Sequence, residues 1–405
     1  MDYIIKRKET KDIAGKKQWL IVYGRRKVGK TFLLKELCGF ENYYTVKTDL
    51  SILSNKGTIA LSAMLEQAKK LLSENKTLVI DEFQRLGSNV LEELTLLHPK
   101  GRLILSGSGQ RVIKKVFEPK SPFLGFFMPL KIGFISPKDM LLNLKGKFEA
   151  EKAIELAAFM REPWTIPGYS NEKAIEFVYN LVVMSRYTIS ALIGEIFTEE
   201  ERELSKKYEA VISLIGSGTW NTKELASILY SRGLIPDAGL THISQYLKNL
   251  ESMGLVESIK LHKKKGRFYR LASPIMNIYY YLDSRYDIGE REITLNEIKP
   301  TLEKLFNLEI QNFVADIFSE AYGGRKEYFV CGDREVDFII TKRNKPEIIG
   351  EVKWGKISNE DISKFRKNSA GLQGKRVLVC KSGALSAEDI EFIDAEKLLA
   401  LAKHI

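Results

Sequence analysis

The sequence predicts a multidomain α/β protein, and three observations support this prediction. The chain has 405 residues, 44% hydrophobic and 28% charged, which is too long for one small core and too apolar for disorder. Short apolar runs of strand type occupy the first third. Leucine and alanine stripes of helical type then dominate the middle, and strand-like runs return near the C-terminus. We therefore expect two to four folded domains.

The first strand-like run is "QWLIVY", residues 18–23, which is typical of a strand buried on both faces of a parallel sheet. A leucine-patterned helix follows it. The stretch between them, "GRRKVGKT", is a complete G-x-x-x-x-G-K-T loop. Its residues are the predicted nucleotide-binding residues: Gly24, Arg25, Arg26, Lys27, Val28, Gly29, Lys30 and Thr31.

The chemistry of this loop follows from its residue types. The two glycines let backbone N–H groups wrap a phosphate, and the helix dipole adds positive potential. Lys30 can reach the β and γ oxygens and act in catalysis, and Thr31 can ligate Mg²⁺. The alternative is a chance glycine-rich turn, which the flanking strand and helix argue against.

Two further apolar runs supply partner residues. "TLVIDEFQRL", residues 77–86, reads as a neighbouring strand that ends in Asp81 and Glu82. Asp81 would hold Mg²⁺ through water, and Glu82 would orient the attacking water as a catalytic residue. "RLILSGSG", residues 102–109, places Ser106 where it could sense the γ-phosphate from the next strand. A solvated acidic turn is the alternative for the acidic pair.

Together with "SPFLGFFMPLKI", residues 121–132, these motifs resemble the archaeal ATPase family of AAA+-related, STAND-like P-loop NTPases. The resemblance implies ATP binding and hydrolysis with Mg²⁺. It also implies a compact five-stranded αβα core over residues 1–135, then a helical lid and a winged helix.

The resemblance has one departure, because Phe126 stands where the family commonly has an arginine. Arg85 and Arg111 could substitute for a transition-state arginine, although surface salt bridges are the alternative for both. "WTIPGY", residues 164–169, resembles the Gly-x-Pro lid motif of these ATPases with the order altered.

The middle of the chain has helical patterning. Residues 136–206 carry stripes such as "EAEKAIELAAFM" and "EKAIEFVYNLVVM", separated by a loop with Pro163 and Pro167. We expect this segment to form the helical lid.

Residues 207–290 show the order of a winged helix-turn-helix: three helices, the second starting near Asn221, and two short strands joined by a basic tip. Polar residues on the third helix and basic residues in the tip are the predicted DNA contacts: Thr241, Ser244, Gln245, Lys248, Asn249, Lys263, Lys264, Lys265 and Arg267. The open alternative is a module that docks on another protein or on the nucleotide-binding core.

Residues 291–405 begin with an amphipathic helix that carries Glu309 at the border of its apolar stripe. A hairpin of two apolar strands follows. Alternation of side chains puts Glu351 and Lys353 on one face, where Asp337 of the adjacent strand can meet them. Two converging carboxylates can bind Mg²⁺, which polarises a phosphodiester and generates hydroxide, while the lysine stabilises charge.

This Asp and Glu-x-Lys hairpin resembles the PD-(D/E)XK nuclease core, with Glu309 in the place of its first-helix carboxylate. The resemblance implies a restriction-endonuclease-like α/β domain with catalytic residues Asp337, Glu351 and Lys353 and metal ligands Asp337 and Glu351. A nuclease fold used only for binding and a solvated strand face are the alternatives.

Charge and cysteine content bound the remaining expectations. Lys and Arg number 63 against 52 Asp and Glu, a formal charge of +11, which favours double-stranded DNA as a partner over a merely solvated basic surface. The three cysteines share no short spacing, and no apolar run approaches a membrane span of roughly 18 residues. We expect a cytoplasmic protein that is either an ATP-dependent DNA-acting enzyme or a nucleotide-gated regulator with a silent nuclease-like domain. A homo-oligomer is compatible with both.

Overall fold

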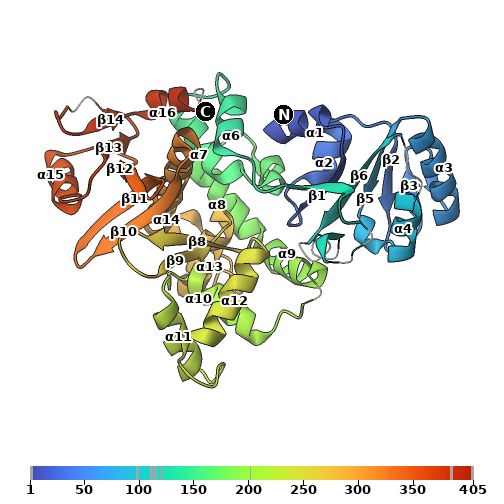
Figure 1. Cartoon of the computed structure of the whole chain (residues 1–405). Coiled ribbons are helices and arrows are strands. Elements are labelled where there is room, and N and C mark those ends of the chain that lie inside the picture. Colours follow the sequence, from blue (N-terminus) through green and yellow to red (C-terminus); the bar gives the residue numbers. More distant parts are fainter. Residues whose placement is uncertain are drawn as a thin grey trace.

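The computed structural model describes residues 3–96, 100–109, 113, 116–119, 121, 123–200, 202–383 and 386–402. An α/β domain formed by the N-terminal part lies to the right in Figure 1. A second α/β lobe formed by the C-terminal part lies to the left, and helices from the middle of the chain lie between and below them. Arg111, one of the two predicted substitute arginines, lies outside the described residues.

The N-terminal sheet has seven strands in the order β4-β3-β2-β5-β6-β1-β7. Five of them, from β2 to β7 in this order, are parallel, as expected for the core, and an antiparallel hairpin extends the β2 edge. The strands are β1 (Trp19–Gly24), β2 (Tyr43–Val46), β3 (Ile52–Ser54), β4 (Gly57–Ile59), β5 (Thr77–Asp81), β6 (Arg102–Ser108) and β7 (Phe127–Lys131). The helical elements are α1 (Lys8–Gly15), α2 (Lys30–Phe32), the π-helix η1 (Leu33–Leu37), α3 (Leu61–Ser73), the 3-10 helix η2 (Phe83–Arg85) and α4 (Ser88–Leu96).

The strand order corrects one expectation. We expected the strand of Asp81 to neighbour the strand of the glycine loop, but β6 lies between β1 and β5. Ile104 of β6 is in register with Leu20 on one side and with Val79 on the other. Because all three strands are parallel, their carboxyl ends still meet at one edge of the sheet, so the functional side chains converge.

The middle of the chain is helical, as predicted. It comprises α6 (Pro137–Leu144), α7 (Ala150–Met160), the 3-10 helix η3 (Pro163–Gly168), α8 (Ala174–Met184) and α9 (Arg186–Glu199). No single helix in the described part of the chain has both the length and the apolar composition of a membrane span. The bent pair α8 and α9, at 66°, meets these criteria only when its two helices are taken together.

Three helices and a hairpin follow: α10 (Lys206–Gly216), α11 (Thr222–Ser231), α12 (Leu240–Ser252), β8 (Val256–Leu261) and β9 (Arg267–Leu271). The predicted start of the second helix is confirmed, because the Asn221 side chain accepts a hydrogen bond from the Glu224 N–H at 2.9 Å. Buried Ile243, Leu247 and Leu250 on α12 hold this helix against its neighbours. The connecting helix α13 (Pro274–Tyr286) leads to the last part of the chain.

The C-terminal lobe contains α14 (Leu295–Tyr322), β10 (Arg325–Cys331), β11 (Arg334–Lys342), β12 (Lys345–Lys353), α15 (Asn359–Asn368), β13 (Lys375–Cys380), β14 (Glu391–Ile393) and α16 (Ala395–Leu401). Its sheet also has seven strands, in the order β14-β13-β12-β11-β10-β8-β9. The hairpin β8–β9 is therefore part of this sheet, since β8 pairs in parallel with β10 through Lys260 and Glu327. The sheet crosses the boundary that we predicted at residue 290.

Partly buried ion pairs join the hairpin, the lid and α14. Asp316 accepts from Arg161 and from Lys326, each at 2.6 Å, and Lys326 also pairs with Glu257 of β8 at 3.0 Å. Removal of one partner of such a network leaves a partly desolvated charge without its partner, which is destabilising. The hairpin is thus held rigidly on the C-terminal lobe.

Candidate active sites

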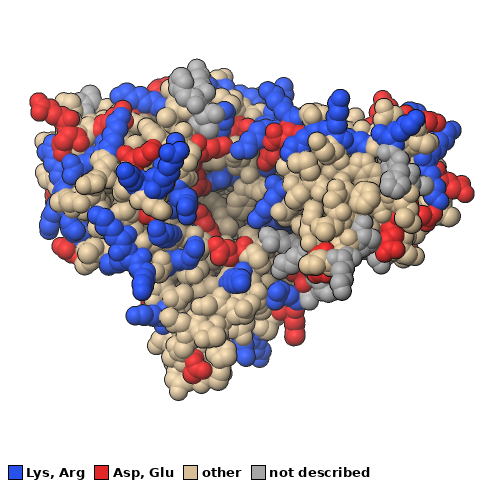
Figure 2. Space-filling view, in the orientation of Figure 1, with Lys and Arg blue, Asp and Glu red and all other residues tan. Residues whose placement is uncertain are grey.

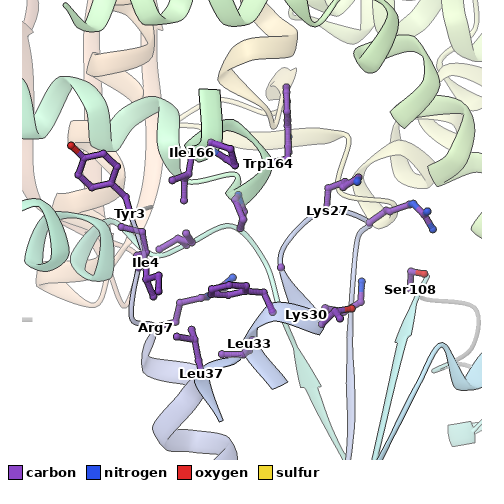
Figure 3. A pocket seen from close by; sticks show the side chains of 18 of the residues that line it. Tyr3, Ile4, Arg7, Lys27, Lys30, Leu33, Leu37, Ser108, Trp164 and Ile166 are labelled. Atoms are coloured by element: carbon purple, nitrogen blue, oxygen red, sulfur yellow. The ribbon is translucent and has the colours of Figure 1, made fainter. Parts of the chain in front are cut away.

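A cavity of about 890 Å³ lies between the glycine loop, the N-terminal segment and the lid. Figure 3 shows Lys30 and Ser108 at one end of it and Tyr3 and Ile4 at the other, with Trp164 above. One end is therefore basic and polar, and the other is apolar and aromatic.

The backbone of the loop after β1 explains its glycines. Gly29 has φ +86°, and Lys27 beside it has φ +65°, so the loop turns through the left-handed region before α2 begins. At Gly24 a Cβ would lie 2.0 Å from the carbonyl oxygen of Ile132, so any larger residue would force β1 and the chain after β7 apart. Both glycines of the motif are thus required by geometry.

Lys30 is buried at the start of α2. Its ammonium group donates to the carbonyl oxygens of Gly24 at 2.8 Å and Arg25 at 3.1 Å. Burial lowers the pKa of Lys30, although the nearby carboxylates of Glu199, Glu82 and Asp81 favour its charged form. A phosphate in the loop would offer this desolvated cation a stronger acceptor than two carbonyl groups.

The acidic pair lies at the carboxyl end of β5. The Asp81 carboxylate accepts from the Thr31 hydroxyl at 2.7 Å and from the Tyr43 hydroxyl at 2.6 Å. Glu82 has φ +57° and accepts from Gln84 at 2.7 Å. The strained backbone of Glu82 aims its carboxylate at the cavity, which it lines.

The structure corrects the prediction for Ser106. This residue is fully buried between β1 and β5 and does not line the cavity. Ser108, two residues further along β6, lines the phosphate end. Both serines follow the apolar run of β6, and which of them reaches the cavity depends on how far this strand extends.

Two arginines of the loop point in different directions. The Arg25 side chain points away from the phosphate end of the cavity. It donates at 3.2 Å to the carbonyl oxygen of Gly254, in the turn after α12, and it pairs with buried Glu162 of the lid. Arg26 lines the cavity and pairs with Glu195 at 2.7 Å and Glu199 at 3.0 Å on α9. The Arg25 side chain thus links the loop to two other parts of the chain, and the predicted part of Arg25 in nucleotide binding rests on its backbone.

The Glu199 carboxylate forms hydrogen bonds with two side chains that face the phosphate end of the cavity. Its carboxylate accepts from the Ser108 hydroxyl at 2.7 Å and from Arg26 at 3.0 Å. A γ-phosphate would compete with this carboxylate for both donors, since each is a good phosphate ligand. Nucleotide binding would therefore affect the contacts that α9 makes with the loop and with β6.

We expect Glu199→Gln to lower the Kd for ATP about tenfold, because the neutral amide competes less strongly for Arg26 and Ser108. Titration with a fluorescent ATP analogue measures this. Glu195→Gln is the matched control: Glu195 pairs with Arg26 alone and is half exposed, so its effect should be small. Weaker ATP binding by Glu199→Gln would show instead that Glu199 positions the two donors.

The apolar end of the cavity was largely missed by sequence reasoning. Tyr3, Ile4 and Ile5 line it from the N-terminus, opposite Trp164 and the other predicted lid residues. Buried Arg7 ties the N-terminal segment to the glycine loop, since it donates to the carbonyl oxygen of Val28 at 2.8 Å. The basic N-terminal stretch carries no pattern that distinguishes Arg7 from its neighbours, whereas the apolar triplet Tyr3–Ile5 was a usable signal.

Arg85 is the predicted substitute for a transition-state arginine that lies within the described residues. Arg85 lines the cavity, pairs with Glu82 at 3.5 Å and donates to the carbonyl oxygen of Val46 at 2.6 Å. Phe126 lies beside Trp19, with ring centroids 6.1 Å apart, at the end of β1 remote from the glycine loop. An arginine at position 126 would not reach the phosphates of a nucleotide bound to the same chain.

The second candidate site lies on β11 and β12. The register that pairs Phe338 with Gly350 also brings Asp337 and Glu351 opposite each other, as the alternation predicted. The Lys353 ammonium group lies 3.2 Å from the Glu351 carboxylate, and the Val352 N–H donates to Asp337 at 2.8 Å. The three predicted residues therefore converge on one face of the sheet.

The electrostatics of this pair favour a cation. Burial and then repulsion by Glu351 raise the pKa of Asp337 to about 8, and burial also raises the pKa of Glu351. Each carboxylate thus resists ionisation in the absence of a counter-charge. Within the described ranges, no group of three or more His, Cys, Asp or Glu side chains has metal-binding geometry, so this site offers two carboxylates.

Glu309 does not join them in this structure. It is buried and paired with Arg270 of β9, and Asn277 donates to its other oxygen at 3.2 Å. The positive charge of Arg270 neutralises the negative charge that Glu309, the predicted first-helix carboxylate, would otherwise offer to a metal ion.

Most predicted DNA contacts are accessible. Thr241, Ser244, Gln245 and Lys248 are exposed on α12, and the tip residues Lys263, Lys264, Lys265 and Arg267 are exposed between β8 and β9. Asn249 is the exception: it is buried and donates to the Tyr208 hydroxyl at 2.6 Å, so it serves packing.

The fold and the first site define a P-loop nucleotide-binding domain of the AAA type. A family model described as an AAA domain matches residues 16–122, which span β1 to the end of β6 and beyond. This part of the chain is therefore similar to an AAA domain, and a long C-terminal part follows it.

Three known proteins are similar to this chain. An uncharacterized protein of Methanocaldococcus jannaschii is 24% identical over 398 residues, covering 87% of this chain and 86% of its own. A Walker-type ATPase of Pyrococcus abyssi has a similar fold, with a TM-score of 0.51 and 16% identity over 68% of this chain and 96% of that chain. The ORC2 protein of Aeropyrum pernix, in ADPNP and ADP complexes, gives a TM-score of 0.40 at 16% identity, covering 71% of this chain and 96% of that chain.

Proposed function

We propose that the AAA domain binds ATP with Mg²⁺ and hydrolyses it, and that nucleotide state controls an interaction of the C-terminal part with DNA. Thr31 and Glu82 line the phosphate end of the 890 Å³ cavity, and buried Asp81 accepts a hydrogen bond from Thr31 at 2.7 Å; this arrangement carries the proposal. It places a metal-binding hydroxyl and carboxylate next to a second carboxylate that can orient water.

The residues present fit a magnesium ion. The Thr31 hydroxyl and the Asp81 carboxylate lie 2.7 Å apart and are hard oxygen ligands of the kind that Mg²⁺ prefers. When bound, the ion neutralises charge on the β and γ oxygens. Tyr43 fixes the orientation of Asp81 by its hydrogen bond at 2.6 Å.

The remaining steps fall to side chains. Lys30 would turn from the two loop carbonyl groups to the phosphates, and Ser108 would exchange Glu199 for the γ-phosphate. Glu82, oriented by Gln84, would accept a hydrogen bond from the attacking water. The lid residue Trp164 and the N-terminal residue Tyr3 would cover the base and exclude water from the cavity.

We propose a division of labour into an ATPase core 1–135, a helical lid 136–206, a winged helix 207–290 and a nuclease-like domain 291–405, in which the β8–β9 hairpin of the winged helix also completes the sheet of the nuclease-like domain. Arg25 supports coupling between them, since it joins the glycine loop to the lid and to the turn after α12. A shift of the glycine loop would move Arg25 and so alter its contacts with the lid and with the turn after α12.

DNA is the partner that the basic surface supports. Lys and Arg gather over the lobe that carries β8 to β12, whereas the lower lobe of α11 and α12 shows little basic colour on this face (Figure 2). The exposed tip between β8 and β9 contributes Lys263, Lys264, Lys265 and Arg267. We therefore assign the larger share of phosphate binding to the tip and the smaller to α12.

Replacement of Lys263, Lys264 and Lys265 by alanine is expected to weaken DNA binding and reduce its salt dependence. Each phosphate contact contributes about 0.9 to the slope of log K against log salt, so the slope should fall by up to about 3. Fluorescence anisotropy of a labelled duplex across a salt series measures it. Lys17, Lys47 and Lys56, exposed on the AAA domain, form the control triple. An unchanged slope in the tip variant would exclude the tip as a DNA contact.

We further propose that Asp337, Glu351 and Lys353 cleave DNA with a bound divalent cation. The neighbouring carboxylates of Asp337 and Glu351 fit a cation, because the ion would relieve the repulsion by Glu351 that helps to raise the pKa of Asp337. Lys353 would stabilise the charged phosphate.

A regulatory switch with a silent nuclease-like domain is the second candidate function. The pairing of Glu309 with Arg270 favours it, because this pair removes one carboxylate from the metal site. A cleavage assay separates the two functions.

A further inference from the structure

A second cavity, of about 290 Å³, extends from the candidate cleavage site, since Asp337 and Glu309 are part of its lining, and its aromatic side has no role in the functions proposed above. Aromatic residues from four separate segments line it: Trp220 between α10 and α11, Phe268 and Tyr269 of β9, Tyr281 of α13, and Tyr328 of β10. Its volume is close to the lower end, about 300 Å³, of sites that bind small organic ligands.

The rings form a continuous cluster. Trp220 stacks on Phe268 with centroids 5.5 Å apart and planes at 27°, and Phe268 lies 4.9 Å from Tyr328. All three rings are only partly buried. Aromatic side chains that serve packing alone are expected to bury most of their surface, so this cluster leaves apolar faces open to a ligand.

Polar groups border the aromatic wall. Gln311 and Asn312 of α14 line the cavity, and Gln311 donates to the carbonyl oxygen of Val352 at 3.2 Å. Val352 is the residue between Glu351 and Lys353, so this contact ties the polar wall to the strand of the candidate cleavage site. Side-chain amides carry both donors and acceptors, which suits the edge of a nucleobase.

The cavity is also close to the basic tip. Phe268 directly follows Arg267, and Lys263, Lys264 and Lys265 precede it in the same hairpin. A strand whose phosphates contact this tip would therefore pass the cavity on its way to Asp337, which is itself part of the lining.

We propose that this cavity binds one unpaired nucleobase of a DNA strand, stacked on the cluster of Trp220 and Phe268. Stacking on aromatic rings is available to every base, so the site would recognise an unpaired or frayed position rather than a sequence. The inference rests on the proposed DNA binding and adds to it a preference for DNA ends or distorted sites next to Asp337.

The test compares two duplexes of the same sequence, one blunt and one with a short single-stranded overhang that contains 2-aminopurine. Binding is measured by anisotropy in EDTA, which prevents cleavage, and stacking by quenching of the 2-aminopurine. We expect the overhang duplex to bind about tenfold more tightly than the blunt one and to show quenching. Trp220→Leu should lose both effects and leave binding to the blunt duplex unchanged.

Two further variants keep the test decisive. Trp220→Tyr retains an aromatic face and should keep the preference, and its behaviour separates stacking from loss of folding. Tyr187→Leu removes an exposed ring of α9 outside the cavity and should change nothing. Competition with free deoxynucleoside monophosphate identifies the source of the base, and strong competition would reassign the cavity to a free nucleotide and overturn the proposal.

The remaining outcomes are distinct. Equal binding of blunt and overhang duplexes without quenching would overturn this inference and leave the proposed DNA binding intact. Failure of the unaltered protein to bind either duplex would overturn both.

Discussion

Replacing Lys30 by alanine is expected to lower ATP turnover about a hundredfold or more. The side chain is the buried cation at the phosphate end of the cavity, and it has exchangeable contacts with two loop carbonyl groups. Its loss removes charge stabilisation where negative charge develops on the transferred phosphoryl group. Phosphate release from ATP in the presence of Mg²⁺ measures the effect.

Lys35→Ala is the matched control, because Lys35 lies just after the loop in η1, is exposed and does not line the cavity. It should retain most of the turnover. Turnover that is unaffected by Lys30→Ala would remove the AAA domain as the source of hydrolysis, and a melting curve for each variant excludes unfolding as the cause of a loss.

Asp337→Asn is expected to have two opposite effects: loss of metal-dependent DNA cleavage and a more stable metal-free fold at alkaline pH. Cleavage should be lost because an amide is a poor ligand for Mg²⁺ and cannot share the charge of the ion with Glu351. Incubation of supercoiled and linear DNA with Mg²⁺ or Mn²⁺ measures it, with ATP, with a non-hydrolysable analogue and without nucleotide.

The stability effect follows from the raised pKa of Asp337. An unfolded aspartate titrates near 4, whereas burial and Glu351 raise the folded pKa to about 8. Between these pH values the folded chain retains a proton that the unfolded chain has released, so the free energy of unfolding falls as pH rises from about 4 to about 8. The amide of the Asp337→Asn variant has no such proton to lose. In EDTA at pH 9 we expect Asp337→Asn to be more stable by at least about 2 kcal/mol, measured by urea denaturation.

Asp333→Asn provides the control for both effects, since Asp333 lies exposed in the turn before β11. It should cut DNA and unfold like the unaltered protein. Absence of cutting by the unaltered protein under all these conditions, with ATP turnover intact, would favour the regulatory switch. Reduced stability of Asp337→Asn at pH 9 would show that the carboxylate is compensated in the folded state.

The two sites differ in how far they could be predicted. The glycine loop lies in one contiguous stretch, and its chemistry depends on local backbone conformation, so Lys30 and Thr31 were predictable from spacing alone. Asp337 and Glu351 were predictable because alternation along two strands of one hairpin fixes which side chains share a face. In each case a short segment contains the information.

Ser108 illustrates where prediction failed. The apolar run ends at two serines, and which of them faces the cavity depends on how far β6 extends beyond its neighbours. Glu199 and Arg7 could not have been chosen, because each reaches the glycine loop from an element distant in sequence. No local pattern marks an acid of α9 or an arginine before α1 as a partner of that loop.

The sequence by itself determined the class of fold, the phosphate-binding loop and the paired carboxylates, because local periodicity and backbone conformation are encoded over a few consecutive residues. Only the tertiary structure decided the order of strands around β6, the union of the β8–β9 hairpin with the C-terminal sheet and the pairing of Glu309 with Arg270. These features depend on long-range packing and on the requirement that buried charges find partners, and both involve residues far apart in the chain.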